Sequence, residues 1–421
     1  MSLNNKYMRD IMNRKEAFKL HIMKCVVEEK MTIKEASERL KLSIRQVYRL
    51  KGAMKGKDVL SMLHGNCGRQ PKRTLSPEIK GKILEIKAMP EYDCVNILHF
   101  QELLEREHKI TISYYALRKL LINNGYKSPK THRERKISHN RRERKAYFGE
   151  MLQIDGSRHQ WFKNDNTYYT IHGAIDDATG IVTGLYMCKN ECMEGYIQIM
   201  CQTIECNGIA KSIYSDGLSL FFSSKEPSLE EQLEGKMINE TQFGKMMSIL
   251  GIHMIRAYSS QAKGRIERMW GTLQGRLETE FAIRNIKTPE EANAFFPYFL
   301  KELNRRFSVK AVKSESKFLP KPTYIDLDIL FSYKVNRIVD NSGCFSLEGT
   351  IFQCNVKGIL PKTKIVVLIS KKLGVKVLFK ERLSTPTPIL TKEKSEIKGS
   401  SVSAIIDDFV YHYCLKNERH S

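Results

Sequence analysis

Two aspartates each follow a short apolar run, at the place where a strand would end. Asp155 closes the run MLQID (Met151–Asp155), Asp216 closes IAKSIYSD (Ile209–Asp216), and a glycine follows each of them. Because glycine has no side chain, it lets a second backbone or a phosphate come close to the carboxylate. Carboxylates placed in this way can bind a hard divalent cation through oxygen.

A third acid lies in the basic segment SSQAKGRIERMWGTLQGRL. Glu267 is surrounded there by Lys263, Arg265 and Arg268, and Gly264 allows the start of a helix to approach another group. Acids from two strands and one helix can converge on a pair of Mg²⁺ ions, which stabilise the attacking and leaving oxygens of an in-line phosphoryl displacement. The pattern therefore indicates phosphodiester chemistry.

Other acids compete for the same role, because an Asp-Gly pair is more often a turn and a Glu on a basic helix is more often a solvated ion-pair partner. Asp176 and Asp177 also follow a predicted strand, but Asp177 with Thr179 and Gly180 is more typical of a hairpin turn. Glu278 lies too far along the predicted helix. Spacing alone leaves these alternatives open.

The region that must position the acids, residues 149–310, alternates predicted strands and helices. Three strands are followed by a helix, a strand, a helix, a strand and a helix, which indicates an α/β layer with one mixed sheet. The expected strands are Met151–Asp155, Tyr168–Asp176, Ile181–Met187, Ile209–Asp216 and His253–Ala257, and the expected helices are Gly195–Asn207, Phe243–Leu250 and Gln261–Phe281.

Residues 1–64 are predicted to form an all-α domain with a helix-turn-helix. Thr32 and Glu35 form a capping-box pattern at the start of one helix, and Ser43 is the expected cap of the next. This arrangement is typical of DNA-binding units, although an ordinary helical hairpin has the same pattern. The residues expected to face DNA are Arg45, Gln46, Tyr48 and Arg49.

A second helix-turn-helix domain is predicted over residues 76–126, with a basic linker on each side. The linkers, residues 65–75 and 127–148, are rich in Lys and Arg, so we expect them to contact phosphates. The residues expected to bind DNA are Tyr114, Arg118 and Lys119 in the domain, Arg69, Lys72 and Arg73 in the first linker, and Arg133, Arg135, Arg141 and Arg142 in the second.

The C-terminal part changes to short strands separated by turn residues. Residues 325–383 are expected to form a small β-barrel, and residues 384–421 a linker and tail. The chain is thus expected to be multidomain, with tandem all-α helix-turn-helix units, an α/β core with a mixed sheet, and a C-terminal β-barrel.

The charge of the chain indicates a polyanionic partner. Its 421 residues contain 70 Lys and Arg against 47 Asp and Glu, which gives a formal net charge of +23 and a pI near 9.5. Nucleic acid is the first candidate and an anionic membrane surface the second. The longest aliphatic run, Ile365–Ile369, is far shorter than the roughly 20 residues of a membrane span. The N-terminal segment lacks the apolar core of a signal peptide, and the ten cysteines form no Cys-x-x-Cys pair, so we expect a cytoplasmic protein with reduced thiols.

The order IDGS, AIDDATG, YSDGLSLF and AYSSQAKGRIERMWGTLQGRL resembles the DDE catalytic domain of bacterial insertion-sequence transposases, specifically the ISNCY-type group within the retroviral-integrase superfamily. The resemblance covers most of the chain, and SQAKGRIER is its most specific segment. It implies a ribonuclease-H-like core and two Mg²⁺ ions, replaceable by Mn²⁺, held by Asp155, Asp216 and Glu267. It also implies that water and then a DNA 3′-hydroxyl attack phosphodiester bonds, without a covalent protein–DNA intermediate.

The same resemblance implies the partners. Such a protein would bind the terminal inverted repeats of its own element and the target DNA, as a homodimer or higher multimer, in association with the bacterial nucleoid. Near the active site, DNA contacts would come from Lys263, Arg265 and Arg268, because Gly271 and Gln274 stand where integrases often carry lysine.

One spacing departs from the superfamily pattern. The second and third acids are 267 − 216 = 51 positions apart, longer than is common, and an acidic insert at Ser223–Asn239 accounts for the excess. A catalytically silent DNA-binding regulator with the same fold is the alternative, and the presence of all three acids disfavours it. An RNA-cleaving ribonuclease H is disfavoured because helix-turn-helix units suit the grooves of B-form DNA.

Overall fold

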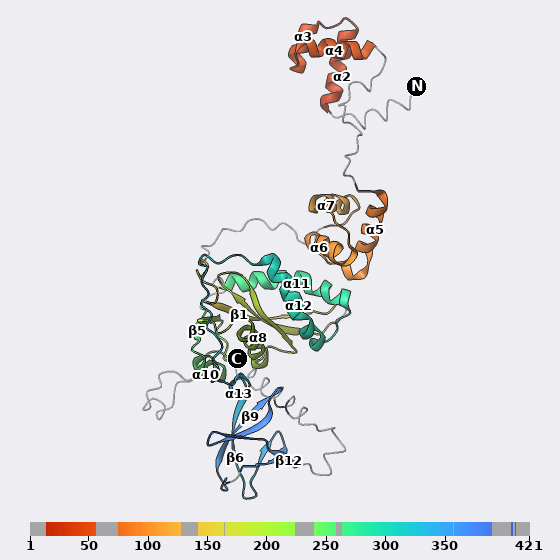
Figure 1. The fold of residues 1–421 in the computed structure, drawn as a ribbon. Helices are drawn as coiled ribbons and strands as arrows, with labels where there is room; N and C mark the ends of the chain where they lie inside the picture. The colour runs from red at the N-terminus through yellow and green to blue at the C-terminus, as the bar shows by residue number, and fades with distance from the viewer. Residues whose placement is uncertain are drawn as a thin grey trace. The chain divides into compact units, whose positions relative to one another are not determined.

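The structure is a computed structural model. It describes residues 14–55, 75–127, 142–163, 165–223, 240–257, 263–356 and 358–389, together with residues 406 and 409. The chain divides into two compact units, residues 1–82 and 83–421, and each is described by itself (Figure 1). The predicted linker positions Arg69, Lys72, Arg73, Arg133, Arg135 and Arg141 lie outside the described residues, as does nearly all of the expected insert at 223–239.

The first unit contains the helices α2 (Arg14–Val27), α3 (Ile33–Leu40) and α4 (Ile44–Lys55). The expected capping box is present at the start of α3, where the side chain of Thr32 accepts from the backbone of Glu35 and the Glu35 carboxylate accepts from the Thr32 backbone. The helices share a small core that includes Met23, Ala36 and Val47. A turn of three residues therefore separates two short helices, as expected.

The outer face of α4 carries the exposed side chains of Arg45, Tyr48 and Arg49. Gln46 is exposed too, but its side-chain oxygen accepts from the backbone N–H of Ser43 at 3.0 Å, and Ser43 in turn accepts from the Gln46 backbone. This is a second capping box, so Gln46 stabilises the start of α4 and is less available to a base edge than we expected.

The next helical segment consists of α5 (Pro77–Ala88), the short 3-10 helix η2 (Pro90–Tyr92), α6 (Ile97–His108) and α7 (Tyr114–Asn123). The inward positions of α6 and α7 are apolar and include Phe100, Leu103, Leu117 and Leu121, which are buried. The side chains of Tyr114, Arg118 and Lys119 are exposed along α7. We refer to residues 83–126 of this segment as the helical module.

A five-stranded mixed sheet forms the centre of the second unit. Its order is β3-β2-β1-β4-β5, with β1 antiparallel to β2, β2 antiparallel to β3, and β1, β4 and β5 parallel. This order and these directions fit the ribonuclease-H-like core expected from the sequence. The strands are β1 (Leu152–His159), β2 (Tyr169–Asp176), β3 (Val182–Cys188), β4 (Ser212–Ser215) and β5 (His253–Arg256).

Helices cover both faces of this sheet (Figure 1). Because side chains alternate along a strand, Leu152 and Ile154 of β1 face α8 (Met193–Cys206), whereas Gln153 and Asp155 face the opposite side. That opposite side is covered by α11 (Gly264–Arg284) and α12 (Pro289–Phe307), and α10 (Gln242–Ile249) lies beside β5. The two faces of β1 therefore separate an apolar core from a polar one.

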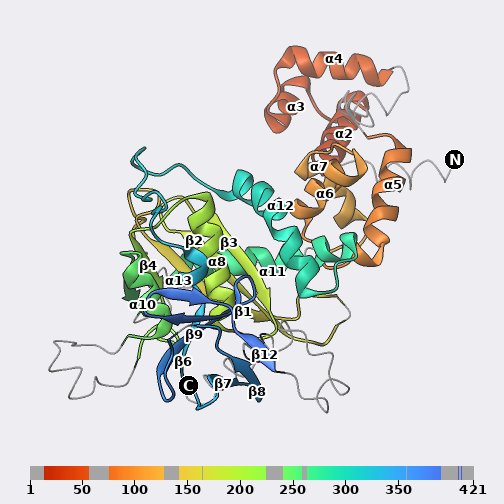
Figure 2. The same ribbon diagram turned by 60° about the horizontal axis from the view of Figure 1, so that its bottom comes forward.

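The C-terminal region is β-rich, as expected, but its strands form two sheets (Figure 2). Their orders are β11-β10-β9-β6 and β12-β8-β7, and within the described ranges no strand pairing joins them into the single closed barrel that we predicted. The apolar cluster against α8 continues into these strands, so the region shares its core with the five-stranded sheet. The elements are α13 (Leu327–Leu330), β6 (Tyr333–Ile338), β7 (Cys344–Leu347), β8 (Thr350–Gln353), β9 (Lys364–Ser370), β10 (Gly374–Phe379), β11 (Arg382–Ser384) and β12 (Thr387–Ile389).

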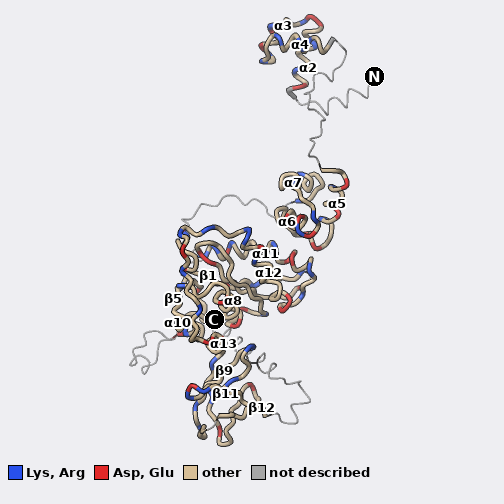
Figure 3. Tube along the Cα trace, in the orientation of Figure 1, with Lys and Arg blue, Asp and Glu red and all other residues tan. Residues whose placement is uncertain are grey.

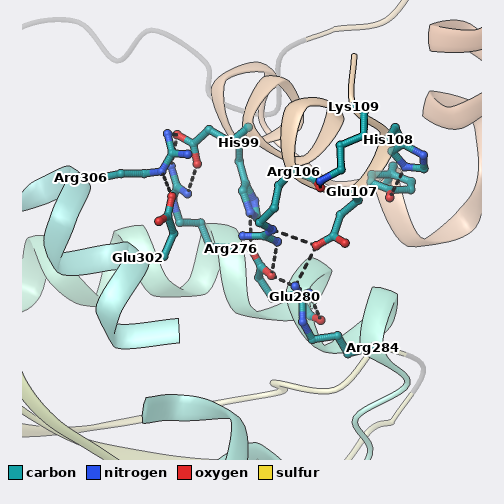
Figure 4. Close-up of polar contacts among 12 residues, drawn as sticks. His99, Arg106, Glu107, His108, Lys109, Arg276, Glu280, Arg284, Glu302 and Arg306 are labelled. Carbon is teal, nitrogen blue, oxygen red and sulfur yellow. Dashed lines mark hydrogen bonds and ion pairs between the residues drawn. The ribbon is translucent and has the colours of Figure 1, made fainter. Parts of the chain in front are cut away.

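The helical module is joined to α11 by a buried polar network (Figure 4). The Glu280 carboxylate of α11 lies 2.9 Å from Nε2 of His99 and accepts from the guanidinium of Arg106 at 2.7 Å. Arg284, one turn further along α11, also donates to Glu280 at 2.7 Å. A second contact is bidentate, because both terminal nitrogens of Arg276 donate to Glu102, at 2.6 and 3.1 Å.

Burial and ion pairing have opposite effects on the pKa of Glu280 in this network. Burial alone would raise the pKa of Glu280, but the hydrogen bond from His99 and the charge of Arg106 outweigh it and hold the pKa at about 2. Burial lowers the pKa of His99, whose Nδ1 has no hydrogen-bond partner among the described residues. A neutral His99 that donates from Nε2 satisfies this geometry, because a protonated Nδ1 would be a buried donor without an acceptor.

Replacing Glu280 by Ala should destabilise the second unit strongly, because it leaves Arg106 and Arg284 without their shared carboxylate. We expect a loss of about 3–5 kcal/mol in the free energy of unfolding, measured by urea denaturation. The control is Glu315→Ala, whose side chain is 74% exposed and which should cost no more than about 0.5 kcal/mol.

A second substitution at the same position, Glu280→Gln, tests the pH dependence. The Glu280 pKa is lower in the folded chain than its ordinary value of 4.5, so its stabilisation is complete above pH 4.5 and is lost as the pH falls towards 2. The stability gap between wild type and Glu280→Gln should therefore shrink between about pH 5 and pH 3. A gap that stays constant over this range would contradict the assigned pairing.

Candidate active site

The two predicted aspartates lie on neighbouring parallel strands. Asp155 lies within β1 rather than at its end, because β1 continues to His159, and Asp216 directly follows β4. The pairing of β1 with β4 places Leu152 opposite Ile213, an offset of 213 − 152 = 61, and the same offset carries Asp155 to Asp216 (216 − 155 = 61). The sheet register therefore brings the two carboxylates to one place.

The ammonium of Lys263 lies between these carboxylates. Its Nζ is 2.7 Å from Oδ1 of Asp155 and 3.3 Å from Oδ2 of Asp216, and its side chain is only 11% exposed. Burial raises the pKa of Asp155, and the charge of Lys263 opposes that rise. Burial lowers the pKa of Lys263, but the two carboxylates outweigh it and raise the pKa above its ordinary value. A single cation is thus shared by two acids.

Trp270 holds the second oxygen of Asp155. The indole Nε1–H donates to Oδ2 of Asp155 at 3.1 Å. The ring reaches this position across β2, where Gly173 is the residue opposite Asp155 and where an added Cβ would lie 2.7 Å from the Trp270 ring. Gly173 is therefore required for the close approach of α11 to the sheet, and the approach orients Asp155.

Glu267 lies in the first turn of α11, between the two residues that contact Asp155. At about 100° per residue, Lys263, Glu267 and Trp270 share one face of the helix. The Glu267 side chain is exposed, and in the described part of the chain no three acidic, His or Cys side chains lie close enough together to hold a metal ion. The structure brings the two aspartates together, and Glu267 lies on the helix face that carries Lys263 and Trp270.

A further acid, Glu191, was missed from the sequence. It precedes α8, its carboxylate accepts from the Tyr196 hydroxyl, and a Cβ added at Gly156 would lie 2.9 Å from its carboxyl carbon. Burial raises the pKa of Glu191, and the negative charges of Asp216 and Asp155 raise it further. The glycine after Asp155 does admit a close neighbour, as expected, but a short acidic link before a helix is too common a pattern to identify it.

The competing acids have structural partners. Asp177 is fully buried in the turn after β2 and accepts from Gln153 at 2.8 Å, from Arg265 at 2.8 Å and from Arg142. Asp176 accepts from the backbone of Gly149 and from Thr179, and Glu278 lies 2.7 Å from Nε2 of His159. The hairpin-turn interpretation of Asp177 is confirmed, and each competing acid has a role in the fold.

The basic residues near the site divide into two groups. The side chain of Arg265 is 9% exposed and forms an ion pair with Asp177, which also binds Arg142. We expected both guanidinium groups to contact phosphate, but both stabilise the fold by neutralising Asp177. Arg268, the third basic residue of this segment, is exposed.

Lys and Arg are distributed over every described part of the chain (Figure 3). Among the described helices, none has the length and apolar character of a membrane span.

Sequence comparison places the chain among known proteins. It is 31% identical over 388 residues to the transposase for insertion sequence IS1202 of Streptococcus pneumoniae, a match that covers 84% of this chain and 82% of that protein. The chain belongs to the insertion-sequence transposases. The transposase is also 28% identical over 343 residues to the putative transposase y4bF of Sinorhizobium fredii, which covers 78% of this chain and 73% of that one. No family model matches it.

Two solved structures with weak similarity to this transposase come from T-cell lymphotropic viruses. The simian T-cell lymphotropic virus intasome in complex with PP2A regulatory subunit B56 gamma matches 67% of this chain and 90% of its own, at 16% identity and a TM-score of 0.30. The dimeric form of the HTLV-2 integrase catalytic core domain in complex with magnesium matches 39% and 92%, at 18% identity and a TM-score of 0.27. At these scores the likeness adds nothing to what the sheet topology itself shows.

Replacing Lys263 by Met tests whether a cation is needed between the aspartates. Without metal, the variant should lose about 1–3 kcal/mol of unfolding free energy, because two partly buried carboxylates are left without a counter-charge. Added Mg²⁺ should then stabilise the variant more than the wild type, as measured by thermal denaturation with and without EDTA. Lys313→Met is the exposed control. An unchanged response to Mg²⁺ would contradict a cation site at this position.

Proposed function

We propose that this transposase cleaves DNA at the ends of its insertion sequence and joins those ends to target DNA, with Mg²⁺ held by Asp155, Asp216 and Glu267. The observation that carries the proposal is the shared ammonium of Lys263, which lies 2.7 and 3.3 Å from the two aspartates. Two carboxylates that already share one cation form the oxygen donor set that Mg²⁺ prefers. Glu267 supplies the third carboxylate from the same face of α11.

Bound Mg²⁺, as one or two ions, would stabilise the charge that develops on the attacking and leaving oxygens of the phosphodiester. The protein groups around it have separate tasks. Trp270 holds one oxygen of Asp155 and so orients the other towards Asp216. If metal displaces the ammonium of Lys263 from the two aspartates, that ammonium, four residues before Glu267, can contact a DNA phosphate. Mn²⁺ offers a similar preference for oxygen ligands and is expected to replace Mg²⁺.

The helical parts would select the DNA. Arg45 and Arg49 on α4 and Tyr114, Arg118 and Lys119 on α7 are exposed on helices of a kind that enters the major groove. We propose that they read the terminal inverted repeats, that the linkers contact phosphates, and that two or more copies assemble on the two ends of the element in the bacterial nucleoid. The net charge of +23 supports such a polyanionic partner.

The triad is tested by single substitutions that keep the side-chain shape. Asp155→Asn, Asp216→Asn and Glu267→Gln should each abolish nicking of a labelled element end in Mg²⁺, a loss on the order of several kcal/mol in transition-state stabilisation. DNA affinity should stay nearly unchanged. Glu278→Gln is the matched control on the same helix, since its carboxylate is bound to His159. Robust nicking by Asp216→Asn would refute the metal site, and a wild-type protein that binds its ends without nicking them would favour a silent regulator.

The division of labour between base readers and phosphate contacts is tested with salt. Replacing Arg133, Arg135 and Arg141 by Gln should weaken binding to all duplexes and flatten the slope of log affinity on log salt by up to about 3. Arg45→Ala should instead lower affinity for the preferred sequence by roughly 1–3 kcal/mol. The measurement is a salt titration of binding to specific and random duplexes. A linker variant that loses sequence preference and keeps its slope would contradict this division.

A further inference from the structure

Glu191 lies within electrostatic reach of Asp155, Asp216 and Lys263. We infer that Glu191 is a fourth acidic residue of the divalent-cation site, which strengthens metal binding by Asp155 and Asp216 from beside Gly156. Its role is that of a positioning residue, because the described structure joins it to the site through neighbouring groups and not through a contact with either aspartate. This inference rests on the metal-dependent function proposed above.

The close approach of Glu191 to Gly156 places its carboxylate near Asp155. A Cβ at Gly156 would lie 2.9 Å from the carboxyl carbon and 3.0 Å from Oε1 of Glu191, so the carboxylate packs against the backbone next to Asp155. The strand β4 ends at Ser215, whereas β1 continues to His159, so the part of β1 beyond Asp155 is not paired with β4. Beyond Asp155, β1 is thus paired with β2 but not with β4, and a bound cation or DNA can approach the carboxylate from that open side.

Tyr196 holds the Glu191 side chain in this place. The Tyr196 hydroxyl donates to Oε1 of Glu191, and the ring is fully buried in edge contacts with His172 and Phe221, whose ring centroids are each 4.7 Å away. The hydroxyl of this rigid ring fixes the position of the Glu191 carboxylate, which is the acceptor that the buried hydroxyl requires.

Mutual repulsion explains why the carboxylate would help. The carboxylates of Asp155, Asp216 and Glu191 act electrostatically on one another; among the described residues the ammonium of Lys263 binds two of them, and the guanidinium of Arg256 lies beside Gly217. A divalent cation at the same place gains attraction from each of them and offsets their mutual repulsion. Groups just outside the direct ligands commonly change metal affinity by about 10–100-fold when they are removed.

The experiment compares the Mg²⁺ affinity of full-length variants by isothermal titration calorimetry, without DNA. Glu191→Gln keeps the shape and removes the charge, and it should weaken Mg²⁺ binding by at least about tenfold. Tyr196→Phe keeps the buried ring and removes the anchoring hydroxyl, and it should give a smaller loss. Glu205→Gln, an exposed residue of the same helix α8, is the control and should bind as wild type does.

Asp216→Asn, measured in parallel, separates this inference from the proposed function. If Asp216→Asn weakens Mg²⁺ binding and Glu191→Gln does not, the metal site stands and the role of Glu191 is wrong. If Asp216→Asn leaves Mg²⁺ binding unchanged, the proposed metal site itself is wrong. Thermal denaturation in EDTA shows whether Glu191→Gln folds, and if it does not, an unaltered Mg²⁺ affinity of Tyr196→Phe would overturn the inference.

Discussion

Two carboxylates on adjacent parallel strands repel one another unless a cation lies between them, and the second unit is arranged around this constraint. Lys263 supplies the cation from the start of α11. For its ammonium to reach both aspartates, α11 must lie directly on the sheet. Gly173 permits that approach, because any side chain there would meet the Trp270 ring.

The same helix connects the site with the helical module. Lys263 lies directly before α11, Glu267 and Trp270 lie in its first half, and Arg276, Glu280 and Arg284 in its second half bind α6. At 1.5 Å per residue, the 13 positions from Glu267 to Glu280 span about 20 Å of a single rigid element. The helical module and the proposed metal ligand Glu267 are therefore a fixed distance apart, which suits an enzyme proposed to cut at a defined position beside the sequence it binds.

Several groups that looked available from the sequence are used by the fold. The guanidinium groups of Arg265 and Arg142 neutralise the buried Asp177, and the amide of Gln46 caps the helix that carries it. These assignments follow from the cost of burying an unpaired charge or leaving a helix end unsatisfied, which a sequence pattern alone does not reveal. The cluster of positive charge around Glu267 is accordingly smaller than the sequence implies.

The local features of this chain were determined by the sequence itself. The capping residues Thr32, Glu35 and Ser43, the alternation that produces the mixed sheet, and the glycine after Asp155 all act over a few neighbouring residues, so they can be recognised one segment at a time. The resemblance in SQAKGRIER pointed to the transposase family in the same way, and the comparison with the IS1202 transposase confirms it.

What only the tertiary structure decided depends on contacts between distant segments. The register that sets Asp155 beside Asp216, the lysine shared between them and the approach of Glu191 to Gly156 join residues 35 to 108 positions apart. No spacing rule predicts which long-range partner a charged side chain will take. The C-terminal strands show the same limit, because their alternation predicted β structure but could not predict whether the sheets close. Local structure depends on neighbouring side chains. Contacts between segments that are distant in the sequence depend instead on which arrangement leaves the fewest buried charges and polar groups unsatisfied.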